Sequence, residues 1–531
     1  MLALALGVLL RLGQYAVSRA LWLDEALLAT NFLRRGFLGL AQPLDRGPTA
    51  PLGFLWLEKA ASLAIGSSEY ALRLVPLLAG LATLLLLPRV ARRYVSRPAL
   101  PLAVALVALA PFLVYYSSEV KPYAFDALAS VALLGLAASA ARRRGDGRTM
   151  ATFALAGAAL VWLSQPAVFV LAGAGLCLGL RALRLRDRRW IAMLAATAAV
   201  WIVSFAGAYL VSRRQLIDPE YMRAFWRSGF LPLRPRTVMD WTWIPRMATR
   251  VFREPLGILG RDPTPLSVVA AAAAALAFAL GCAWMWRHGR RFRLALLVSP
   301  MLLAIVASAA EVYPFGSTAQ AGGRVLIFLI PSLAFIVAEG VAALPRMLPR
   351  AAGRIAFALA ALLVLLPAAS YAAFSVPQLR GEIKPLLEYA NQQRRPGDVM
   401  YVYYNGLPSF EYYAGRYGWD AAHTVRGVCA RLRPQAYVED LARLRGLPRV
   451  WVLMVDGTPV GEFDEKPLIV GFLEHVGRRL DDQVAVGASL YLYDLRPGPS
   501  DPGPFSIAVP PLPRDPAMDC RGAWAPLPNA R

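Results

Sequence analysis

Residues 89–125 read RVARRYVSRPALPLAVALVALAPFLVYYSSEVKPYAF and show the pattern that decides the fold. A cluster of arginines comes first, an apolar segment follows at residues 99–117, and the stretch ends in a turn that carries Glu119 and Lys121. A helix needs about 20 residues to cross the hydrocarbon core of a bilayer. The stretch therefore predicts a membrane-spanning helix that connects a basic loop with a turn on the opposite face.

The same alternation continues along the chain. Arginine clusters separate the apolar segments, at residues 89–97, 142–148, 181–189, 287–293 and 346–354. Because cytoplasmic loops retain Lys and Arg, all the clusters can lie on the cytoplasmic side at once. This arrangement predicts about 11 crossings, with the N-terminus inside and the C-terminus outside. They are expected at residues 1–18, 72–90, 99–117, 122–141, 150–165, 167–182, 190–211, 264–286, 294–311, 324–344 and 353–375.

Composition agrees with a membrane protein. Of 531 residues, 57% are hydrophobic, and the mean hydropathy of +0.46 is too high for an ordinary soluble protein. The net charge of +23 does not indicate nucleic-acid binding, because the excess arginine lies in short loops where membrane orientation explains it. Residues 1–18 are expected to form a membrane helix and not a cleavable signal peptide, since Arg11 and Gln14 interrupt the segment.

The regions outside the membrane divide the chain into two domains. Residues 19–70 form the first outer loop, with expected surface helices at residues 25–35 and 51–65. From residue 376 onward, strands alternate with helices, which indicates a small α/β domain. The fold class predicted is an all-α membrane domain at residues 1–375, followed by an extracytoplasmic α/β domain at residues 376–531.

In this second domain the expected helices are residues 382–394, 409–417, 434–445 and 467–479. The expected strands are residues 399–404, 450–455 and 488–495, and the proline-rich tail from residue 496 is expected to be irregular. Cys429 and Cys520 both lie in this domain, where disulfides persist if it is outside, and we expect them to pair. Cys177 and Cys282 lie in apolar segments and are expected to be core residues.

The first candidate for chemistry is Trp22-Leu23-Asp24-Glu25, directly after the first crossing. Two adjacent carboxylates at a membrane surface are costly to desolvate, which makes them functional candidates. The alternative is structural: Asp24 could cap the helix at residues 25–35, with Glu25 favoured by the helix dipole.

The second candidate is the turn that holds Glu119, Lys121 and Tyr123. It offers a carboxylate, an ammonium group and a phenol, although Glu119 and Lys121 could also simply pair with each other. Lys121 is informative because lysine is rare in this chain. Arg73 and Arg324 enter two further crossings near the outer face. Each could be a membrane anchor or could bind a lipid phosphate, for which a guanidinium group is well shaped.

At this point the chain resembles a known family. It has Trp-x-Asp-Glu after one crossing, then two surface helices, then Ser68-Glu69-Tyr70-Ala71-Leu72-Arg73-Leu74-x-Pro76 and Tyr116-Ser117-Ser118-Glu119-x-Lys121-x-Tyr123. These features in this order are similar to those of the GT-C integral membrane glycosyltransferases. Within these the chain resembles the bacterial group related to protein O-mannosyltransferases and to the lipid A aminoarabinose transferase. Residues 19–130 carry most of the likeness, and residues 324–331 carry a weaker part. Many relatives have His-Pro-Pro in the first outer loop, whereas this chain has Thr49-Ala50-Pro51-Leu52, so acceptor specificity is not transferred.

The resemblance implies a polyprenyl-phosphate sugar as donor and an acceptor hydroxyl on a protein, lipid or glycan, at the outer face of the bacterial inner membrane. Such a reaction needs a base on one side and positive charge on the other. Asp24 matches the family's first-loop acid and is the expected base, with Glu25 orienting either Asp24 or the acceptor. Lys121, Arg73 and Arg324 are expected to stabilise the leaving phosphate.

Glu119 and Tyr123 are expected to support this donor-phosphate site. No cofactor and no His or Cys metal cluster is expected, because the chain has few histidines; an acidic cation site at Asp24 and Glu119 is the alternative. Displacement from the opposite face implies inversion at the sugar carbon. Two other functions fit the same sequence. A transporter or lipid flippase would also have many crossings with a few buried charges, and a scaffold protein would use the outer α/β domain to recruit a partner.

Overall fold

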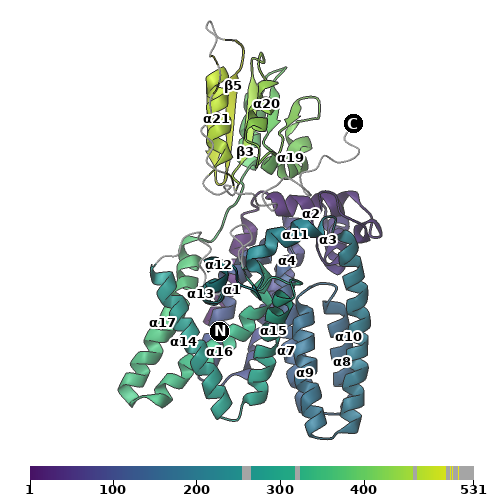
Figure 1. The fold of residues 1–531 in the computed structure, drawn as a ribbon, viewed down its shortest axis with the longest axis vertical. Coiled ribbons are helices and arrows are strands. Elements are labelled where there is room, and N and C mark those ends of the chain that lie inside the picture. The colour runs from purple at the N-terminus through teal and green to yellow at the C-terminus, as the bar shows by residue number, and fades with distance from the viewer. Residues whose placement is uncertain are drawn as a thin grey trace.

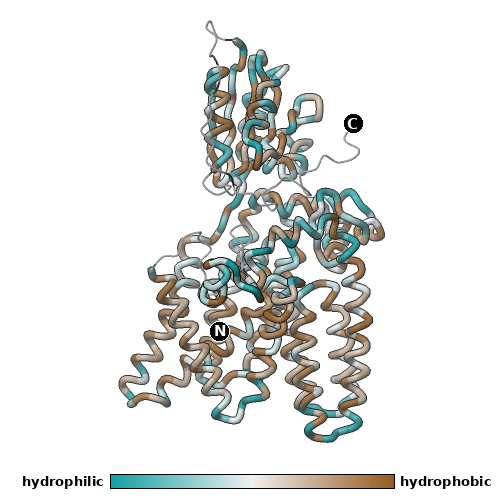
Figure 2. The backbone as a smooth tube through the Cα atoms, viewed as in Figure 1, coloured by the Kyte–Doolittle hydropathy of each residue, from teal (hydrophilic) through white to brown (hydrophobic). Residues whose placement is uncertain are grey.

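The computed structural model describes residues 1–253, 265–316, 323–457 and 463–497, with residues 503, 505 and 512. A bundle of long helices carries a small α/β domain at one end, and two short helices, α2 and α3, lie between them (Figure 1). The long helices are predominantly apolar along their length, whereas the turns at the end of the bundle remote from the α/β domain are hydrophilic (Figure 2). The predicted helical membrane domain followed by a C-terminal α/β domain is confirmed.

The helices before the last arginine clusters are α1 (Leu2–Ala16), α2 (Leu23–Arg34), α3 (Leu52–Ile65), α4 (Glu69–Tyr94), α5 (Leu100–Ala108), α6 (Pro111–Tyr115), α7 (Tyr123–Arg142), α8 (Gly147–Leu160), α9 (Ala167–Arg184), α10 (Arg188–Gln215), α11 (Pro219–Trp226), α12 (Val238–Trp241) and α13 (Trp243–Arg253). They are followed by α14 (Pro265–Arg287), α15 (Arg291–Ala309), the 3-10 helix η4 (Arg324–Leu329), α16 (Ile330–Met347) and α17 (Arg350–Phe374). Further 3-10 turns are η1 (Gly39–Ala41), η2 (Tyr116–Ser118) and η3 (Arg227–Gly229).

Among the described residues, 8 helices are long and apolar enough to cross a membrane. They are α4, α7, α9, α10, α14, α15, the continuous segment η4–α16, and α17. A bent pair, Leu100–Ala108 with Pro111–Ser118, passes the same test when it is taken together. Helices α1 and α8 have 15 and 14 residues and are shorter than a usual span. Each expected crossing therefore has a helical counterpart, but two of them are short.

The expected crossing at residues 99–117 is broken, with an angle of 52° between its two parts. Pro111 has no backbone N–H and disfavours helical geometry at the residue before it, so Ala110 is non-helical with ψ 120°. The break is stabilised by Arg11, whose Nη1 donates to the carbonyl of Ala108 at 2.8 Å. Arg11 and Gln14, which interrupt the first apolar segment, are both buried against protein.

The α/β domain contains α18 (Lys384–Gln393), α19 (Leu407–Tyr413), α20 (Gln435–Ala442) and α21 (Glu465–Val476), with the 3-10 turns η5 (Tyr404–Gly406) and η6 (Ala414–Tyr417). Its strands are β1 (Val399–Val402), β2 (Thr424–Arg426), β3 (Val450–Val455), β4 (Arg478–Ala485) and β5 (Ala488–Asp494). They form one sheet in the order β2-β1-β3-β5-β4. Strands β2, β1 and β3 are parallel, whereas β5 is antiparallel to both of its neighbours.

Two strands of this sheet differ from the sequence prediction. Strand β2 has only three residues and was not expected. The helix expected at residues 467–479 ends at Val476, and Arg478 begins β4. Asp481 and Asp482 have low strand propensity, so the sequence of β4 does not indicate a strand. These residues are accommodated because β4 lies at the edge of the sheet and is held by backbone pairing with β5.

The α/β domain is attached directly to the first outer loop. The backbone N–H of Ala20 donates to both carboxylate oxygens of Glu382 at 3.1 Å, and the N–H of Leu21 donates to the Tyr413 hydroxyl at 2.9 Å. Side chains of α2, such as Phe32, share one hydrophobic core with sheet residues such as Trp451. The loop and the α/β domain therefore pack as one body.

Cys429 is disulfide-bonded. Its expected partner, Cys520, lies outside the described residues, so the pairing stays a prediction. Cys177 and Cys282 are free thiols within α9 and α14.

Candidate active site

The two adjacent acids at the start of α2 have different surroundings, and Glu25 is the buried one. Its carboxylate accepts hydrogen bonds from Nε and Nη2 of Arg73 at 2.9 and 2.7 Å, and from Nη1 of Arg19 at 3.3 Å. It also accepts the N–H of Val120 at 3.0 Å and that of Trp22 at 3.4 Å. Burial alone would raise the pKa of Glu25, but the two arginines outweigh it and lower the pKa. Glu25 is therefore a charged, fully coordinated group.

This geometry also corrects the capping alternative. Helix α2 begins at Leu23 and Trp22 is its N-cap residue, so Asp24 does not cap it. Glu25, in the first turn, reaches back to the backbone N–H of Trp22 in the manner of a capping box.

Asp24 points to a different set of groups and is partly exposed, with 21% of its side chain accessible. Its Oδ2 lies 3.0 Å from Nη1 of Arg324 and 3.7 Å from Nζ of Lys121. Burial would raise the pKa of Asp24, but Lys121, Arg324 and then Arg380 outweigh it and lower the pKa to about 2. Three positions that are far apart in the sequence thus place their charges around one carboxylate.

Lys121 is held by the turn that follows the broken helix. The backbone N–H of Val120 is fixed by Glu25 at 3.0 Å, which positions the next residue toward Asp24. Burial lowers the pKa of Lys121, although Asp24 acts in the opposite direction. An ammonium group that is mostly removed from water and faces a carboxylate is well placed to bind a second anion.

Glu119 does not pair with Lys121, as one interpretation of the turn suggested. Its Oε2 lies 4.0 Å from Nη2 of Arg19, and within the described part of the chain its carboxylate oxygens make no hydrogen bond. Burial first and Glu25 second raise the pKa of Glu119. The buried carboxyl group of Glu119 lies behind the site, and its expected support of Lys121 is limited to a backbone contact, from the Lys121 N–H to its carbonyl at 2.6 Å.

Arg324 and Tyr123 lie together on the other side of Asp24. The guanidinium carbon of Arg324 is 5.7 Å from the centre of the Tyr123 ring, in cation–π contact. The Tyr123 ring in turn packs edge-on against Tyr116, with ring centres 4.7 Å apart. These rings restrict the guanidinium group of Arg324.

Arg73, which was expected to bind the donor phosphate, is engaged elsewhere. Besides Glu25, its Nη1 donates to the carbonyl of Arg19 at 2.6 Å and its Nη2 to that of Ala20 at 3.0 Å. Only 1% of the residue is exposed. Each guanidinium nitrogen therefore already donates to a protein acceptor, and Arg73 fixes the segment that leads into Asp24.

Sequence reasoning missed two basic residues of this site. Arg380 follows the last span and lies over the Trp22 ring, with its guanidinium carbon 3.5 Å from the ring centre. Its charge acts on both Asp24 and Glu119. Arg19 is buried and carries the link to Glu25 described above. Only the excess of arginine over lysine hinted at them, and that signal is shared by every loop.

The described residues contain no group of three or more His, Cys, Asp or Glu side chains that could hold a metal ion. Asp24 and Glu119, the acidic pair considered from the sequence, face different partners, Arg324 and Arg19 respectively. The donor set around Asp24 is rich in cations and so is suited to an anionic ligand.

Part of the sequence matches a known protein family. Residues 49–208 match the family described as dolichyl-phosphate-mannose-protein mannosyltransferase. This segment therefore resembles that mannosyltransferase family, in agreement with the likeness noted in the sequence. It includes Arg73, Glu119 and Lys121, whereas Asp24 and Arg324 lie outside the matched segment. No curated protein matches the sequence.

Several solved structures show a weak likeness. ArnT from Cupriavidus metallidurans bound to undecaprenyl phosphate is 15% identical, with a TM-score of 0.49 over 92% of this chain and 97% of that one. An Archaeoglobus fulgidus oligosaccharyltransferase tethered with an acceptor peptide is 14% identical, with a TM-score of 0.48 over 85% of this chain and 68% of that one. The mycobacterial arabinofuranosyltransferase AftD is 16% identical, with a TM-score of 0.45 over 94% of this chain and 41% of that one.

Proposed function

We propose that this protein transfers a sugar from a polyprenyl-phosphate carrier to an acceptor hydroxyl, with Asp24 as the general base. The observation that carries the proposal is the pairing of one partly exposed carboxylate with two cations, Lys121 and Arg324. A glycosyltransferase that uses a lipid carrier needs both functions at one place. The family match supports the class of reaction, and the likeness to ArnT bound to undecaprenyl phosphate agrees with it.

In the proposed reaction the acceptor oxygen attacks the anomeric carbon of the sugar while the bond from that carbon to the phosphate oxygen breaks. Asp24 takes the proton of the acceptor hydroxyl. The electron pair of the broken bond stays on the carrier phosphate, whose added negative charge is stabilised by Lys121 and Arg324. One displacement from the face opposite the leaving group gives inversion at the sugar carbon.

The same contacts explain how a carboxylate with a pKa of about 2 becomes a useful base. In the free protein, Lys121 and Arg324 hold the proton affinity of Asp24 low. A donor phosphate placed against these cations would compete with Asp24 for them, and the pKa of Asp24 would then rise toward that of a base able to take a proton. Donor binding would therefore activate the base, which limits proton uptake before the sugar arrives.

Glu25 and Arg73 are positioning residues in this proposal. They join the loop segment at residues 19–25 to the turn at Val120, and so they fix the distance between Asp24 and Lys121. The cations take the charge-neutralising role, so we propose that transfer needs no divalent metal. We also propose that the site lies on the extracytoplasmic face, opposite the arginine clusters.

The test uses purified protein, a panel of polyprenyl-phosphate-linked hexoses and pentoses, and release of polyprenyl phosphate as the readout. Asp24→Asn should lower release by about 100- to 10,000-fold, the usual contribution of a general base. Asp45→Asn is the matched control. Asp45 is an acid of the same loop, is 43% exposed and pairs with Arg35, so its loss should leave turnover unchanged.

Near-normal turnover by Asp24→Asn would remove Asp24 as the base. Movement of the lipid-linked sugar across the membrane without release of polyprenyl phosphate would favour the flippase alternative.

A further inference from the structure

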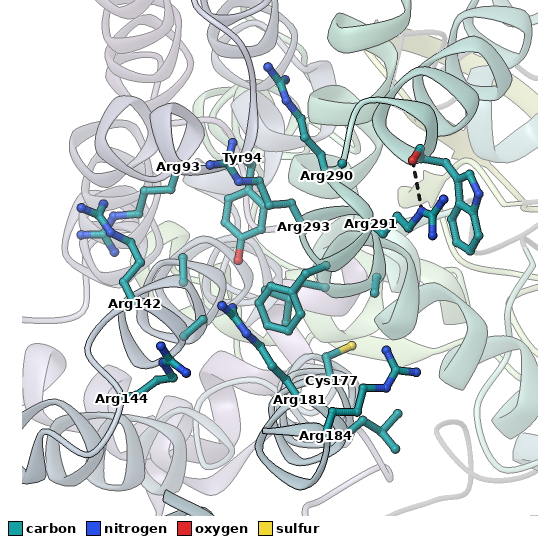
Figure 3. Close-up of a pocket in the computed structure, with 18 of the residues that line it drawn as sticks. Arg93, Tyr94, Arg142, Arg144, Cys177, Arg181, Arg184, Arg290, Arg291 and Arg293 are labelled. Carbon is teal, nitrogen blue, oxygen red and sulfur yellow. Dashed lines mark hydrogen bonds between the residues drawn. The ribbon is translucent and has the colours of Figure 1, made fainter. Parts of the chain in front are cut away.

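A large cavity lies at the end of the bundle remote from Asp24. It has a volume of about 1330 Å³ and is formed by the last turns of α4, α7 and α9, the end of α14 and the first turns of α15. Arginine side chains from these elements surround the same space (Figure 3). No Asp, Glu or Lys of the described chain lines it, so its charge has one sign.

Part of this charge is unpaired. Arg290 donates to the buried Glu339 at 2.7 Å, and Arg181 lies over the Phe292 ring at 4.6 Å. By contrast, Arg142, Arg184 and Arg293 are exposed and have no hydrogen bond or ion pair in the described structure. Like charges gathered around one space repel each other, and an anion that enters it relieves this repulsion.

The orientation of the protein in the membrane does not require this arrangement. Arginines that only mark the cytoplasmic side, or that complement helix C-termini, can point into water in any direction. Arg148, Arg189 and Arg354 lie in loops or helix ends of the same face, are exposed and do not line the cavity. The convergence of the other arginines on one cavity is therefore a separate observation.

The remaining wall of the cavity is apolar. Leu180 comes from α9, and Phe292 and Leu296 come from α15. A cavity with guanidinium groups on one part and aliphatic or aromatic side chains on another matches a molecule with the same division. Basic pockets between membrane helices on the cytoplasmic side recognise the headgroups of anionic lipids.

We propose that this cavity binds the headgroup of an anionic membrane lipid that carries two phosphate groups. The guanidinium groups of Arg142, Arg184 and Arg293 bind the phosphates, and Leu180, Phe292 and Leu296 contact the first carbons of the acyl chains. The ligand is distinct from the sugar donor, and the site does not depend on the function proposed for Asp24.

The experiment measures cardiolipin binding to the full-length purified protein in neutral-lipid nanodiscs, by native mass spectrometry during titration. The wild type should bind cardiolipin more tightly than phosphatidylglycerol, which has one phosphate. The triple variant Arg142→Gln, Arg184→Gln, Arg293→Gln should bind cardiolipin about 100-fold more weakly, since each lost arginine contributes about 1 kcal/mol. The control triple Arg148→Gln, Arg189→Gln, Arg354→Gln removes the same charge from the same face and should change binding less than about twofold.

Equal losses in the two triple variants, or no loss in either, would overturn the site, because the arginines would then act only through total charge. Inorganic pyrophosphate is the second probe. If it binds in neutral nanodiscs with the same variant pattern while cardiolipin does not, the lipid assignment is overturned in favour of a soluble polyphosphate.

Should the cavity triple fail to fold, Arg142→Lys with Arg293→Lys keeps the charge and removes the two-pronged hydrogen bonding. This pair should weaken cardiolipin binding by about tenfold. Unchanged binding in that variant would contradict the proposed contacts.

Discussion

The buried side of helix α2, where Glu25 lies, and its partly exposed side, where Asp24 lies, hold the same functional group in opposite surroundings. Glu25 is 0% exposed and receives two arginines and two backbone N–H groups. Asp24 keeps contact with solvent and meets Lys121 and Arg324 through one oxygen. Two neighbours in the sequence thus differ in the number of partners that each one has and in their access to solvent.

The difference shows how one segment can place a fully paired acid beside a partly exposed one. A buried charge is stable only when it is fully paired and hydrogen-bonded. Glu25 meets this condition, and its partners come from three separate segments, which it holds together. Asp24 is then free to exchange its partners for a ligand without loss of the fold.

The largest expected effect on stability is at Glu25. Glu25→Gln removes one buried charge and leaves Arg19 and Arg73 uncompensated, which should lower the free energy of unfolding by about 3–5 kcal/mol. Asp24→Asn should change it by less than about 1 kcal/mol, because Asp24 is partly solvated. Thermal unfolding in detergent, at one protein concentration, measures both. Similar losses for the two variants would contradict the division of roles.

A second test exchanges arginine for lysine on each side. Arg73→Lys loses the two-pronged contact with Glu25 and should reduce the free energy of unfolding by about 2 kcal/mol. Arg324→Lys should leave the unfolding temperature nearly unchanged and raise KM for the lipid donor by about tenfold. A higher KM for Arg73→Lys without loss of stability would return Arg73 to the donor phosphate, as the sequence first suggested.

The segment that precedes helix α2 is also held by a hydrogen bond to the α/β domain. Tyr413→Phe removes the acceptor for the Leu21 N–H and the donor to Glu69, 3.0 Å away. Leaving this buried N–H unpaired should cost about 1–2 kcal/mol in the free energy of unfolding. Tyr389→Phe, which affects contacts to Asp481 and Gln483 within the α/β domain, is the control and should cost less. Equal effects would mean that the hydroxyl of Tyr413 does not join the two parts.

The smallest effect concerns pH. Asp24 is ionised in the free protein at every pH above about 2, so the acid side of the kcat/KM profile should not be set by its titration near neutral pH. In the donor complex its pKa should be higher, and kcat should fall at a pH about one unit or more above the fall of kcat/KM. A fall of kcat and of kcat/KM at the same acid pH would contradict activation of Asp24 by the donor.

On the alkaline side, the lowered pKa of Lys121 should make kcat/KM fall, and Lys121→Arg should shift that fall to higher pH.

The sequence was sufficient to predict the positions of the spans, the two surface helices and two of the cations near Asp24, Lys121 and Arg324, but not Arg380. Hydrophobic segments of the right length and arginine-rich loops report the environment of each helix directly. The convergence of Asp24 and Arg324 came only from the family resemblance, since 300 residues separate them and no local pattern connects them.

The remaining differences have local physical causes. The break before Pro111 depends on whether another group satisfies the freed carbonyl, and Arg11 does so from a different helix. Glu25 takes both Arg73 and Arg19 as partners, whereas the buried Glu119 only approaches Arg19, at 4.0 Å. Such choices among several possible charge pairs are made by tertiary packing and leave no trace in residue spacing.

The bonds from Ala20 to Glu382 and from Leu21 to Tyr413 have a consequence for biosynthesis. A ribosome adding about 5–20 residues per second delivers Tyr413 tens of seconds after Leu21 has been inserted. Throughout that interval the segment leading to Asp24 lacks the acceptors that fix it. The structure around Asp24 is therefore completed only after the α/β domain has been synthesised.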